Sequence, residues 1–316
     1  MAKSHTKSHT MEFVCAGLAG CGAGVFTTPL EVVKIRMQLQ GELLRKGHYT
    51  VHYRNCVHAF YTIVKSDGLL ALQKGLVPAL WFQLVHNGTR LGSYQVIINT
   101  GFTRDEEGNS KWGRYVLAGA ASGGFGAAVA SPFYLVKTHL QARANQAIAV
   151  GTQHPHDSMT KGFKMIFQEQ GIRGLWRGTM AAVPKSTVGS AAQLATFSSS
   201  KDYIVSLKLF EPNSILNPFF ASIVGGVLIV ACMTPFDVVA TRMYNQPVND
   251  HGHGTLYRNV PDCFIKILHE EGIWGFYKGW GPSFFRLVPH TVLTLVFWDQ
   301  LRLLHHKWTS DINLPT

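Results

Sequence analysis

Three cations border long uncharged stretches of this sequence, and their types indicate what they could bind. Charged side chains beside apolar spans are costly in lipid and usually mark the path of an ion or a solute. No acidic residue lies within the three stretches, so together the cations suit an anion. Arginine offers a forked guanidinium to a carboxylate, whereas lysine is a compact charge for a carboxylate or a phosphate. The cations are Arg90, Lys185 and Arg286, next to the uncharged runs 75–89, 186–200 and 287–298.

The composition favours a membrane protein. Of the 316 residues, 46% are hydrophobic and only 15% are charged, whereas about a quarter of the residues in soluble domains are charged. The aromatic content of 11% excludes a disordered chain, because such a chain can bury enough apolar surface to fold. The formal charge of +11, taken alone, fits a nucleic acid, an acidic membrane or a small anionic solute equally well.

The sequence predicts no catalysis, no cofactor and no metal. It contains no nucleophile with an adjacent base, no metal-ligand spacing and no phosphate loop. Its five cysteines form no CxxC pair and are expected to be free thiols. Histidines at 154 and 156, and at 251 and 253, stand among Gly, Pro and Asp, so we expect them in surface loops. Residues 1–10 are interpreted as a polar tail, since no apolar stretch with a cleavage site follows them.

The uncharged stretches predict membrane-spanning helices. Three longer runs, at 13–30, 115–136 and 212–236, can each cross a hydrocarbon core of roughly 30 Å at about 1.5 Å per residue. The three shorter runs that alternate with them are expected to be spans with one polar face. Small residues spaced by four, at Gly20 with Gly24 and Gly119 with Gly123, predict close helix contacts.

Two motifs recur three times. Pro29, Pro132 and Pro235 are spaced by 103 residues, and a similar pattern of acidic, basic and polar positions follows each proline. A second motif, which ends in a base and a glycine, follows at nearly the same distance each time. A fixed period predicts a repeat architecture, here with repeats at 1–108, 109–210 and 211–316. Since proline kinks a long helix, we expect three kinked helices that converge at one end.

Both motifs resemble those of the mitochondrial carriers, solute carrier family 25, over almost the whole chain. Residues 87–92, 191–197 and 286–294 are most similar to the branch that carries oxaloacetate, dicarboxylates and oxoglutarate, near members 34 and 35. The resemblance implies an all-α membrane protein with six transmembrane helices in three pseudo-threefold repeats and short matrix helices. It also implies a monomer in the mitochondrial inner membrane, with both termini on the cytosolic side.

In such carriers a matrix gate forms when the acid of each proline motif pairs with the base of the next repeat. The resemblance therefore implies the pairs Glu31–Lys137 and Lys34–Asp237. The third pair would join Tyr134 and Ala240, so both of its charged partners are missing together, and this joint loss avoids a buried unpaired charge. Three further positions are expected to brace the pairs by hydrogen bonds: Gln38, Gln141 and Tyr244.

The resemblance also implies a cytosolic gate, with Gln95 paired to Lys201, Ser198 paired to Arg302, and Asp299 facing Ile98 without a partner. Its positions are Tyr94, Gln95, Ser198, Lys201, Asp299 and Arg302. Since two ion pairs of the matrix gate are intact, we expect the matrix gate to be the stronger of the two and the empty carrier to rest open to the cytosol. The alternative, two gates of equal strength, stays open.

The three cations match the substrate contact points of the family. Their neighbours complete the expected substrate site: Asn87, Arg90, Leu91, Lys185, Ser186, Arg286 and Leu287. Amino-acid carriers typically have an acid where this chain has Ser186, and the arginine-rich run of ADP/ATP exchangers is absent. A small dicarboxylate or oxoacid therefore fits best. Any one of the cations could alternatively be structural or extend to the membrane surface.

Gly75, Gly178 and Gly279 precede the second helix of each repeat and resemble the cardiolipin sites of the family, because free N–H groups at helix starts bind phosphate. A purely structural role at the helix start is the alternative.

From the repeats, the gates and the three cations together we expect a transporter that acts by alternating access. Its expected substrate is oxaloacetate, malate or a related oxoacid, with sulfate or a phosphorylated three-carbon acid as further candidates. The alternatives are a proton leak like that of the uncoupling proteins and a membrane adaptor with degenerate transport. The uncharged spans argue against a nucleic-acid-binding protein.

Overall fold

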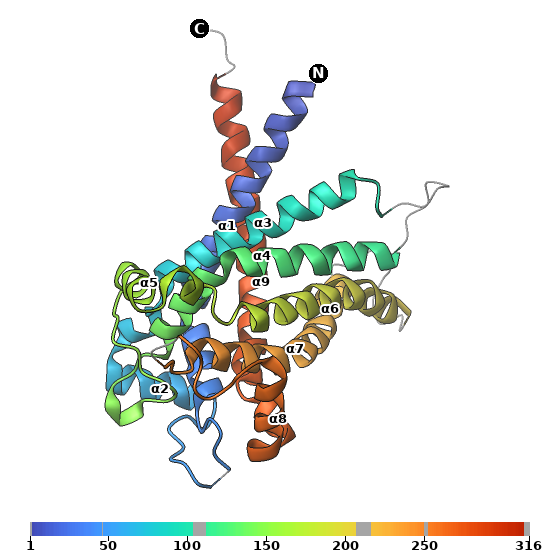
Figure 1. Ribbon diagram of the computed structural model, residues 1–316. Coiled ribbons are helices and arrows are strands. Elements are labelled where there is room, and N and C mark those ends of the chain that lie inside the picture. The colour runs from blue at the N-terminus through green and yellow to red at the C-terminus, as the bar shows by residue number, and fades with distance from the viewer. Residues whose placement is uncertain (1, 46, 104–111, 207–215, 250–251, 313–316) are drawn as a thin grey trace.

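The computed structural model describes residues 2–45, 47–103, 112–206, 216–249 and 252–312 (Figure 1). Within its helices, some side chains lie outside this description: those of residues 2–16, 194, 195, 197–206, 216–223, 288, 295, 299, 302, 303 and 305–312. The described chain is helical, apart from turns, loops and one isolated β-bridge between Val248 and Gly254. The predicted all-α fold is confirmed.

Long and short helices alternate along the chain. The long helices are α1 (Ala2–Leu39), α3 (Leu76–Asn99), α4 (Trp112–Ala142), α6 (Thr179–Ser206), α7 (Leu216–Asn245) and α9 (Trp280–Ile312). The short ones are α2 (Cys56–Asp67), α5 (Met159–Leu175) and α8 (Val260–Glu271), with 3₁₀ turns η1 (Leu69–Gln73), η2 (Gln146–Ile148) and η3 (Ile273–Tyr277). Each of α1, α4 and α7 contains one of the repeated prolines.

The long helices form a closed ring. Each packs against its neighbours in the order α1, α3, α4, α6, α7, α9 and back to α1. Glycines permit some of these contacts: Gly24 lies against Leu80 of α3, and Gly123 lies against Ser190 of α6. A ring of helices surrounds a centre, which all six can line with side chains.

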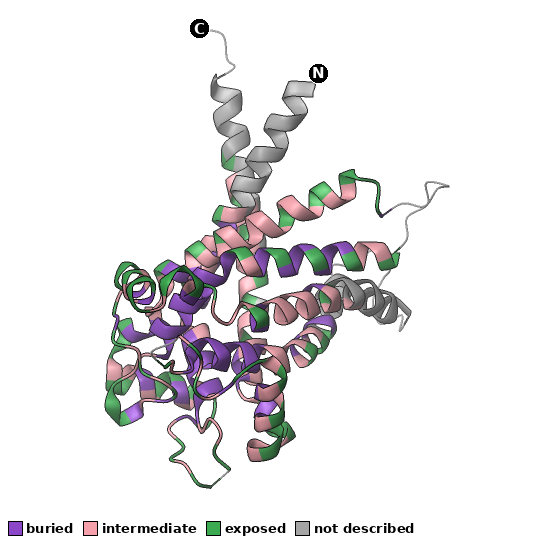
Figure 2. Cartoon of the chain, viewed as in Figure 1, coloured by how far each residue is buried: buried purple, intermediate pink, exposed green. Residues whose placement is uncertain are grey.

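The short helices pack at one end of the ring, here called the short-helix end (Figure 1). Asn55 caps α2 by accepting a hydrogen bond from the N–H of His58, and Asn259 caps α8 in the same way through Asp262. Ile63 of α2 and Ile267 of α8 are fully buried. Figure 2 shows buried residues concentrated at this end. The short-helix end is therefore the packed end of the ring.

Hydropathy alone recognises only part of the ring. Among the described residues, three helices are long and apolar enough to span a membrane: Gly17–Leu39, Trp112–Ala142 and Val224–Asn245. The bent pair Cys56–Asp67 and Leu69–Asn99 would make a fourth. The helices that follow each short helix carry more polar residues, among them Arg90 of α3, Lys185 of α6 and Arg286 of α9. This is the expected pattern of spans with one polar face.

Candidate functional site

Two ion pairs join the proline motifs at the short-helix end. The Lys137 ammonium of α4 lies 2.8 Å from the Glu31 carboxylate of α1. The Lys34 ammonium of α1 lies 2.6 Å from the Asp237 carboxylate of α7. The side chains of all four residues are largely buried. Each pair connects two different repeats, with the partners that the resemblance implies.

The glutamines expected as braces contact these pairs. Gln38 donates a hydrogen bond to Asp237 at 2.7 Å, and Gln141 donates one to Glu31 at 3.3 Å. Tyr244, at the third brace position, differs: its hydroxyl lies 2.7 Å from the hydroxyl of Ser131. Tyr244 therefore joins α7 to α4 without contacting an ion pair.

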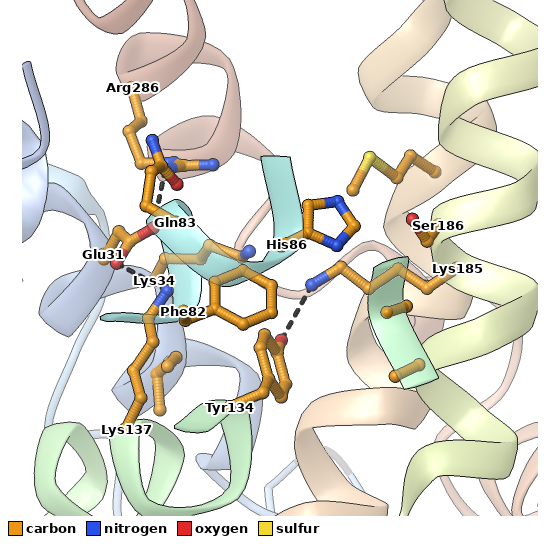
Figure 3. Close-up of a pocket in the computed structure, with 14 residues that line it drawn as sticks. Glu31, Lys34, Phe82, Gln83, His86, Tyr134, Lys137, Lys185, Ser186 and Arg286 are labelled. Atoms are coloured by element: carbon orange, nitrogen blue, oxygen red, sulfur yellow. Dashed lines mark hydrogen bonds and ion pairs between the residues drawn. The ribbon is translucent and has the colours of Figure 1, made fainter. Parts of the chain in front are cut away.

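The junction that lacks an acid and a base is occupied by Lys185. Its ammonium group lies 2.7 Å from the Tyr134 hydroxyl and 2.7 Å from the Asp237 carboxylate. Tyr134 belongs to α4, Lys185 to α6 and Asp237 to α7, so one lysine connects three helices. Figure 3 shows the contact of Lys185 with Tyr134. The sequence had predicted Lys185 as a substrate contact and gave no signal for this second connection.

Arg286 makes the equivalent connection on the other side of the ring. Its guanidinium on α9 lies 2.6 Å from the Glu31 carboxylate. Glu31 and Asp237 are thus each shared by two cations. Four cations face two carboxylates in this group, which leaves a formal excess of two positive charges.

A cavity of about 140 Å³ lies beside these groups in the centre of the ring. Figure 3 shows their side chains converging on it from several helices. His86 of α3 and Ser186 of α6 line it as well. The remaining lining residues are Ile35, Phe82, Gln83, Ala127, Tyr134, Ala182 and Met233. An anion in this cavity would meet Lys185 and Arg286 together.

Arg90 lies apart from the other two cations. It lines a second cavity of about 140 Å³, together with Leu91, Tyr94, Ser122, Ser190 and other residues. Among the described residues, no hydrogen bond or ion pair engages its guanidinium. The remaining two expected contacts lie elsewhere: Asn87 is near Gly20 of α1, and Leu287 packs against Gly226 of α7. The structure thus brings two of the three predicted cations together.

The expected cytosolic gate is only partly described. Tyr94 lines the second cavity, and Gln95 donates a hydrogen bond to Asn99 one turn along its own helix at 2.9 Å. The side chains of Ser198, Lys201, Asp299 and Arg302 lie outside the described residues.

An acid of the second motif and an arginine of the proline motif together hold the end of a long helix from another repeat. Arg36 pairs with Asp67 at 2.9 Å and donates to the carbonyl of Arg143, just beyond the end of α4. Arg242 pairs with Glu271 and donates to the carbonyl of Gln38 in α1. Burial alone would raise the pKa of Glu271, but hydrogen bonds and charge from Arg242, with the charge of Lys278, lower it. Two repeats therefore hold a neighbouring helix end through a buried charged pair.

The middle repeat uses histidines for the same purpose. His139 of α4 stands where the other repeats have arginine, and its Nε2 lies 2.9 Å from the carbonyl of Tyr244 in α7. The His154 ring stacks on His139 with 3.5 Å between centroids, and His156 Nε2 lies 3.2 Å from His139 Nδ1. Residues 154 and 156 lie in a loop, as predicted, but their rings are not free at the surface, because His139 of α4 packs against them: His156 is buried and His154 is half-buried. Burial lowers the pKa of His154 to about 4. We call these three residues the histidine stack.

The three glycines expected at lipid sites have a structural reason of their own. Gly75, Gly178 and Gly279 have φ values of +74°, +85° and +78°, which favour glycine. A Cβ on Gly75 would lie 2.8 Å from Gln141, and one on Gly178 would lie 2.8 Å from Tyr244. These positions therefore bring the start of each following helix close to a brace residue.

Comparison with known proteins agrees with this arrangement. The family described as "Mitochondrial carrier protein" matches residues 5–104, 108–208 and 211–307. The chain is 51% identical to human solute carrier family 25 member 35 over 95% of its length and all of the relative. It is 38% identical to the mitochondrial oxaloacetate transport protein of Saccharomyces cerevisiae, covering 95% of this chain and 91% of that one. It is 37% identical to the mitochondrial citrate transporter E of Aspergillus niger, covering 96% and 97%.

The family consists of transporters of the mitochondrial inner membrane, and a triple match over most of the chain accounts for the repeated motifs and the ring of helices alike. The chain belongs to the mitochondrial carrier family.

Proposed function

We propose that this carrier transports a small anion with two negative groups, of the class of oxaloacetate, malate and related dicarboxylates or oxoacids. The observation that carries the proposal is the excess of two positive charges beside the central cavity. A dianion there neutralises the excess, whereas a cation or a neutral solute leaves it uncompensated. Sulfate and phosphorylated three-carbon acids satisfy the same charge requirement.

The relatives support the same class of substrate. Two of them are named for oxaloacetate and for citrate, which are both carboxylates. In this proposal Arg286 grips one carboxylate through its forked guanidinium and Lys185 attracts the second. Ser186 offers a hydroxyl from the same cavity. Arg90, in the second cavity with Leu91, is the third cation on the path. Asn87 and Leu287, which line neither cavity, are kept as proposed contacts for another stage of the transport cycle.

We further propose that the short-helix end faces the matrix and that its ion pairs form the matrix gate. The pairs of Glu31 with Lys137 and of Lys34 with Asp237 close this end between repeats. The corresponding gate at the opposite end consists of Tyr94, Gln95, Ser198, Lys201, Asp299 and Arg302. The closed matrix gate supports an empty carrier that rests open to the cytosol and exchanges one anion for another by alternating access.

The carrier is proposed to act as a monomer and to bind cardiolipin at Gly75, Gly178 and Gly279. Each glycine ends a turn at the start of a long helix, where free N–H groups attract phosphate. The bases Lys74, Arg177 and Lys278 immediately precede these glycines. A single ring encloses the whole cavity, so a second copy is not needed to build the site.

Transport by the purified protein in liposomes tests the proposed function. Vesicles are loaded with malate, and uptake of labelled malate, oxaloacetate, sulfate, phosphorylated three-carbon acids and lysine is measured. We expect exchange of one or more dianions and none of lysine. Arg286→Gln should reduce this exchange at least tenfold, since it removes a charged hydrogen-bond partner of the anion.

Other outcomes would identify other functions. Preferred uptake of lysine would contradict the anion site. Proton flux without anion exchange would indicate a leak like that of the uncoupling proteins. If no solute moves although loading is confirmed, the chain is a membrane adaptor, which the two intact ion pairs argue against.

A further inference from the structure

The junction between the second and third repeats is closed without its own acid and base. Tyr134 and Ala240 occupy the two positions, and they are 5% and 0% exposed. An acid and a base here would complete a third ion pair like the other two. The tyrosine hydroxyl instead accepts a hydrogen bond from Lys185, which reaches this junction from α6.

Lys185 is held from several directions at once. Its ammonium contacts the Tyr134 hydroxyl and the Asp237 carboxylate, each at 2.7 Å. The same ammonium lies 4.4 Å from the centroid of the Tyr134 ring, where a cation is attracted by the π-electrons. Asp237 in turn pairs with Lys34 of the first repeat. The missing pair is thus replaced by a chain of contacts from α4 through α6 to α7 and α1.

The Tyr134 ring is fixed by its own neighbours. The ring of Phe82 lies 5.1 Å away in an edge-to-face arrangement, and the ring of Tyr244 lies 4.8 Å away. Such aromatic pairs add to the stabilisation that burial gives. The hydroxyl is therefore directed at the Lys185 ammonium by a packed cluster.

We propose that Tyr134, acting through Lys185, is the third link of the matrix gate, and that a bound anion opens the gate at this link. The proposal rests on the proposed function, because it takes Lys185 as a substrate contact. An anion that binds Lys185 competes with the Tyr134 hydroxyl and with Asp237. At the other two junctions the gate bases Lys34 and Lys137 can stay paired with Asp237 and Glu31 while an anion is bound. Tyr134 is a positioning residue, whose role is to keep the gate closed until an anion arrives.

This role predicts how the carrier behaves without a counter-substrate. If the link holds the gate of the empty carrier closed, weakening it allows the empty carrier to change sides, so one-way efflux becomes possible. Loss of a hydrogen bond to a charged group should raise the ratio of one-way malate efflux to malate exchange about tenfold. A tyrosine that only supports the fold would lower both rates together and leave the ratio unchanged.

The test compares Tyr134→Phe with Tyr53→Phe in liposomes loaded with labelled malate. Tyr53 is an equally buried tyrosine, 1% exposed, whose hydroxyl donates to the carbonyl of Ile148 away from the cavity. We expect the raised ratio only in Tyr134→Phe. The proposal would be overturned if Tyr134→Phe, shown to be folded by a cooperative thermal unfolding transition, had an efflux-to-exchange ratio within twofold of that of the unmodified protein.

A double variant tests the same junction by restoring a charged pair. Tyr134→Asp with Ala240→Lys supplies the acid and base that the other junctions have. We expect the double variant to lack the raised ratio of Tyr134→Phe: its ratio of efflux to exchange should equal that of the unmodified protein or be lower. A folded double variant with the raised ratio of Tyr134→Phe would count against this junction as part of the gate.

Labelling measures the gate without any substrate. Ala182, which lines the cavity, is changed to Cys in a protein whose own cysteines are replaced, and an impermeant maleimide is added from one side. We expect reaction from the cytosolic side only, and additional reaction from the matrix side when Tyr134→Phe is introduced. Equal matrix-side labelling with and without Tyr134→Phe contradicts the link, whereas absence of malate transport in the unmodified protein contradicts only the proposed function.

Discussion

At the scale of single residues, the site depends on carboxylates that each serve two cations. Glu31 contacts Lys137 and Arg286, and Asp237 contacts Lys34 and Lys185. A buried carboxylate with one cation satisfies part of its hydrogen-bonding capacity, and a second cation satisfies more. Breaking such a pair by removing one member is costly, because the other charge stays buried. The bases of the proline motifs, Lys34 and Lys137, are therefore coupled through shared acids to Lys185 and Arg286, the proposed substrate contacts.

Glycine positions provide the prediction at this scale. Gly75 and Gly101 both have positive φ, +74° and +78°, but of the two only Gly75 has a close neighbour, with Gln141 at 2.8 Å and the carbonyl of Lys137 at 3.2 Å. Gly101→Ala should lower the free energy of unfolding by about 1 kcal/mol through backbone strain alone. Gly75→Ala adds a clash and should cost roughly 2–4 kcal/mol. Thermal unfolding of both purified variants measures the difference.

Equal losses of stability in the two glycine variants would show that the close approach to Gln141 is unimportant. Adding cardiolipin to the same samples separates the two roles of Gly75. If Gly75 also serves a phosphate site, the lipid should stabilise Gly101→Ala more than Gly75→Ala.

At the scale of elements, three clamps hold the ends of α1, α4 and α7 at the short-helix end. One of these clamps differs chemically from the other two. Arg36 with Asp67 holds the end of α4, and Arg242 with Glu271 holds the end of α1. The histidine stack holds the end of α7 with help from Arg177, which donates to the carbonyl of Tyr244. The clamp on α7 is therefore the one that can gain charge as the pH falls.

The histidine stack predicts a dependence of stability on pH. Burial lowers the pKa of His154 to about 4 and also lowers the pKa of His156, whereas histidine in an unfolded chain titrates near 6.5. The unfolded chain therefore takes up protons first as the pH falls. Stability should decrease between about pH 6.5 and pH 4, by roughly 2 kcal/mol at pH 5 for His154.

Thermal unfolding between pH 7.5 and pH 5 tests this dependence in the unmodified protein, His154→Gln and His253→Gln. Removing His154 should flatten the loss of stability at low pH, whatever its effect at neutral pH. His253 is exposed in the corresponding loop of the third repeat, at the same end of the ring, and serves as the matched control. An unchanged slope in His154→Gln would mean that other groups cause the loss.

At the scale of the whole molecule, the six long helices of the described residues close one ring around the central cavity. Its lining comes from all three repeats, with Glu31 and Phe82 from the first, Tyr134 and Lys185 from the second, and Met233 and Arg286 from the third. The pseudo-threefold architecture supplies three equivalent junctions. One of them has Tyr134 and Ala240 in place of an acid and a base, so the contacts between repeats are asymmetric although the fold is not.

The complete cavity within one chain predicts that copies work independently. When active protein is mixed with the inactive Arg286→Gln variant before reconstitution, transport should fall in linear proportion to the active fraction. At an equal mixture about half of the activity should remain, since each monomer carries its own site. A fall to a quarter would instead indicate a dimer in which both copies must be active. The total amount of protein is held constant as the control.

The sequence by itself determined the helical repeat and the family, through uncharged runs, a period of 103 residues, and acids and bases at fixed positions in each motif. The two ion pairs of the proline motifs were implied by the resemblance to that family. It also indicated that the third pair is missing, because Tyr134 and Ala240 carry no charge. Arg90, Lys185 and Arg286 were recognised as candidate substrate contacts because they are cations beside uncharged runs.

Only the tertiary structure decided what those cations contact and how the missing pair is replaced. Lys185 lies 51 residues from Tyr134 along the chain, and Arg286 lies 255 residues from Glu31, so no spacing rule joins them. The separation of Arg90 into its own cavity and the covering of His154 by His139 arise from helix packing as well. Composition and period specify which elements form. Contacts between repeats depend instead on which side of each helix faces the centre once the helices have packed into a closed ring.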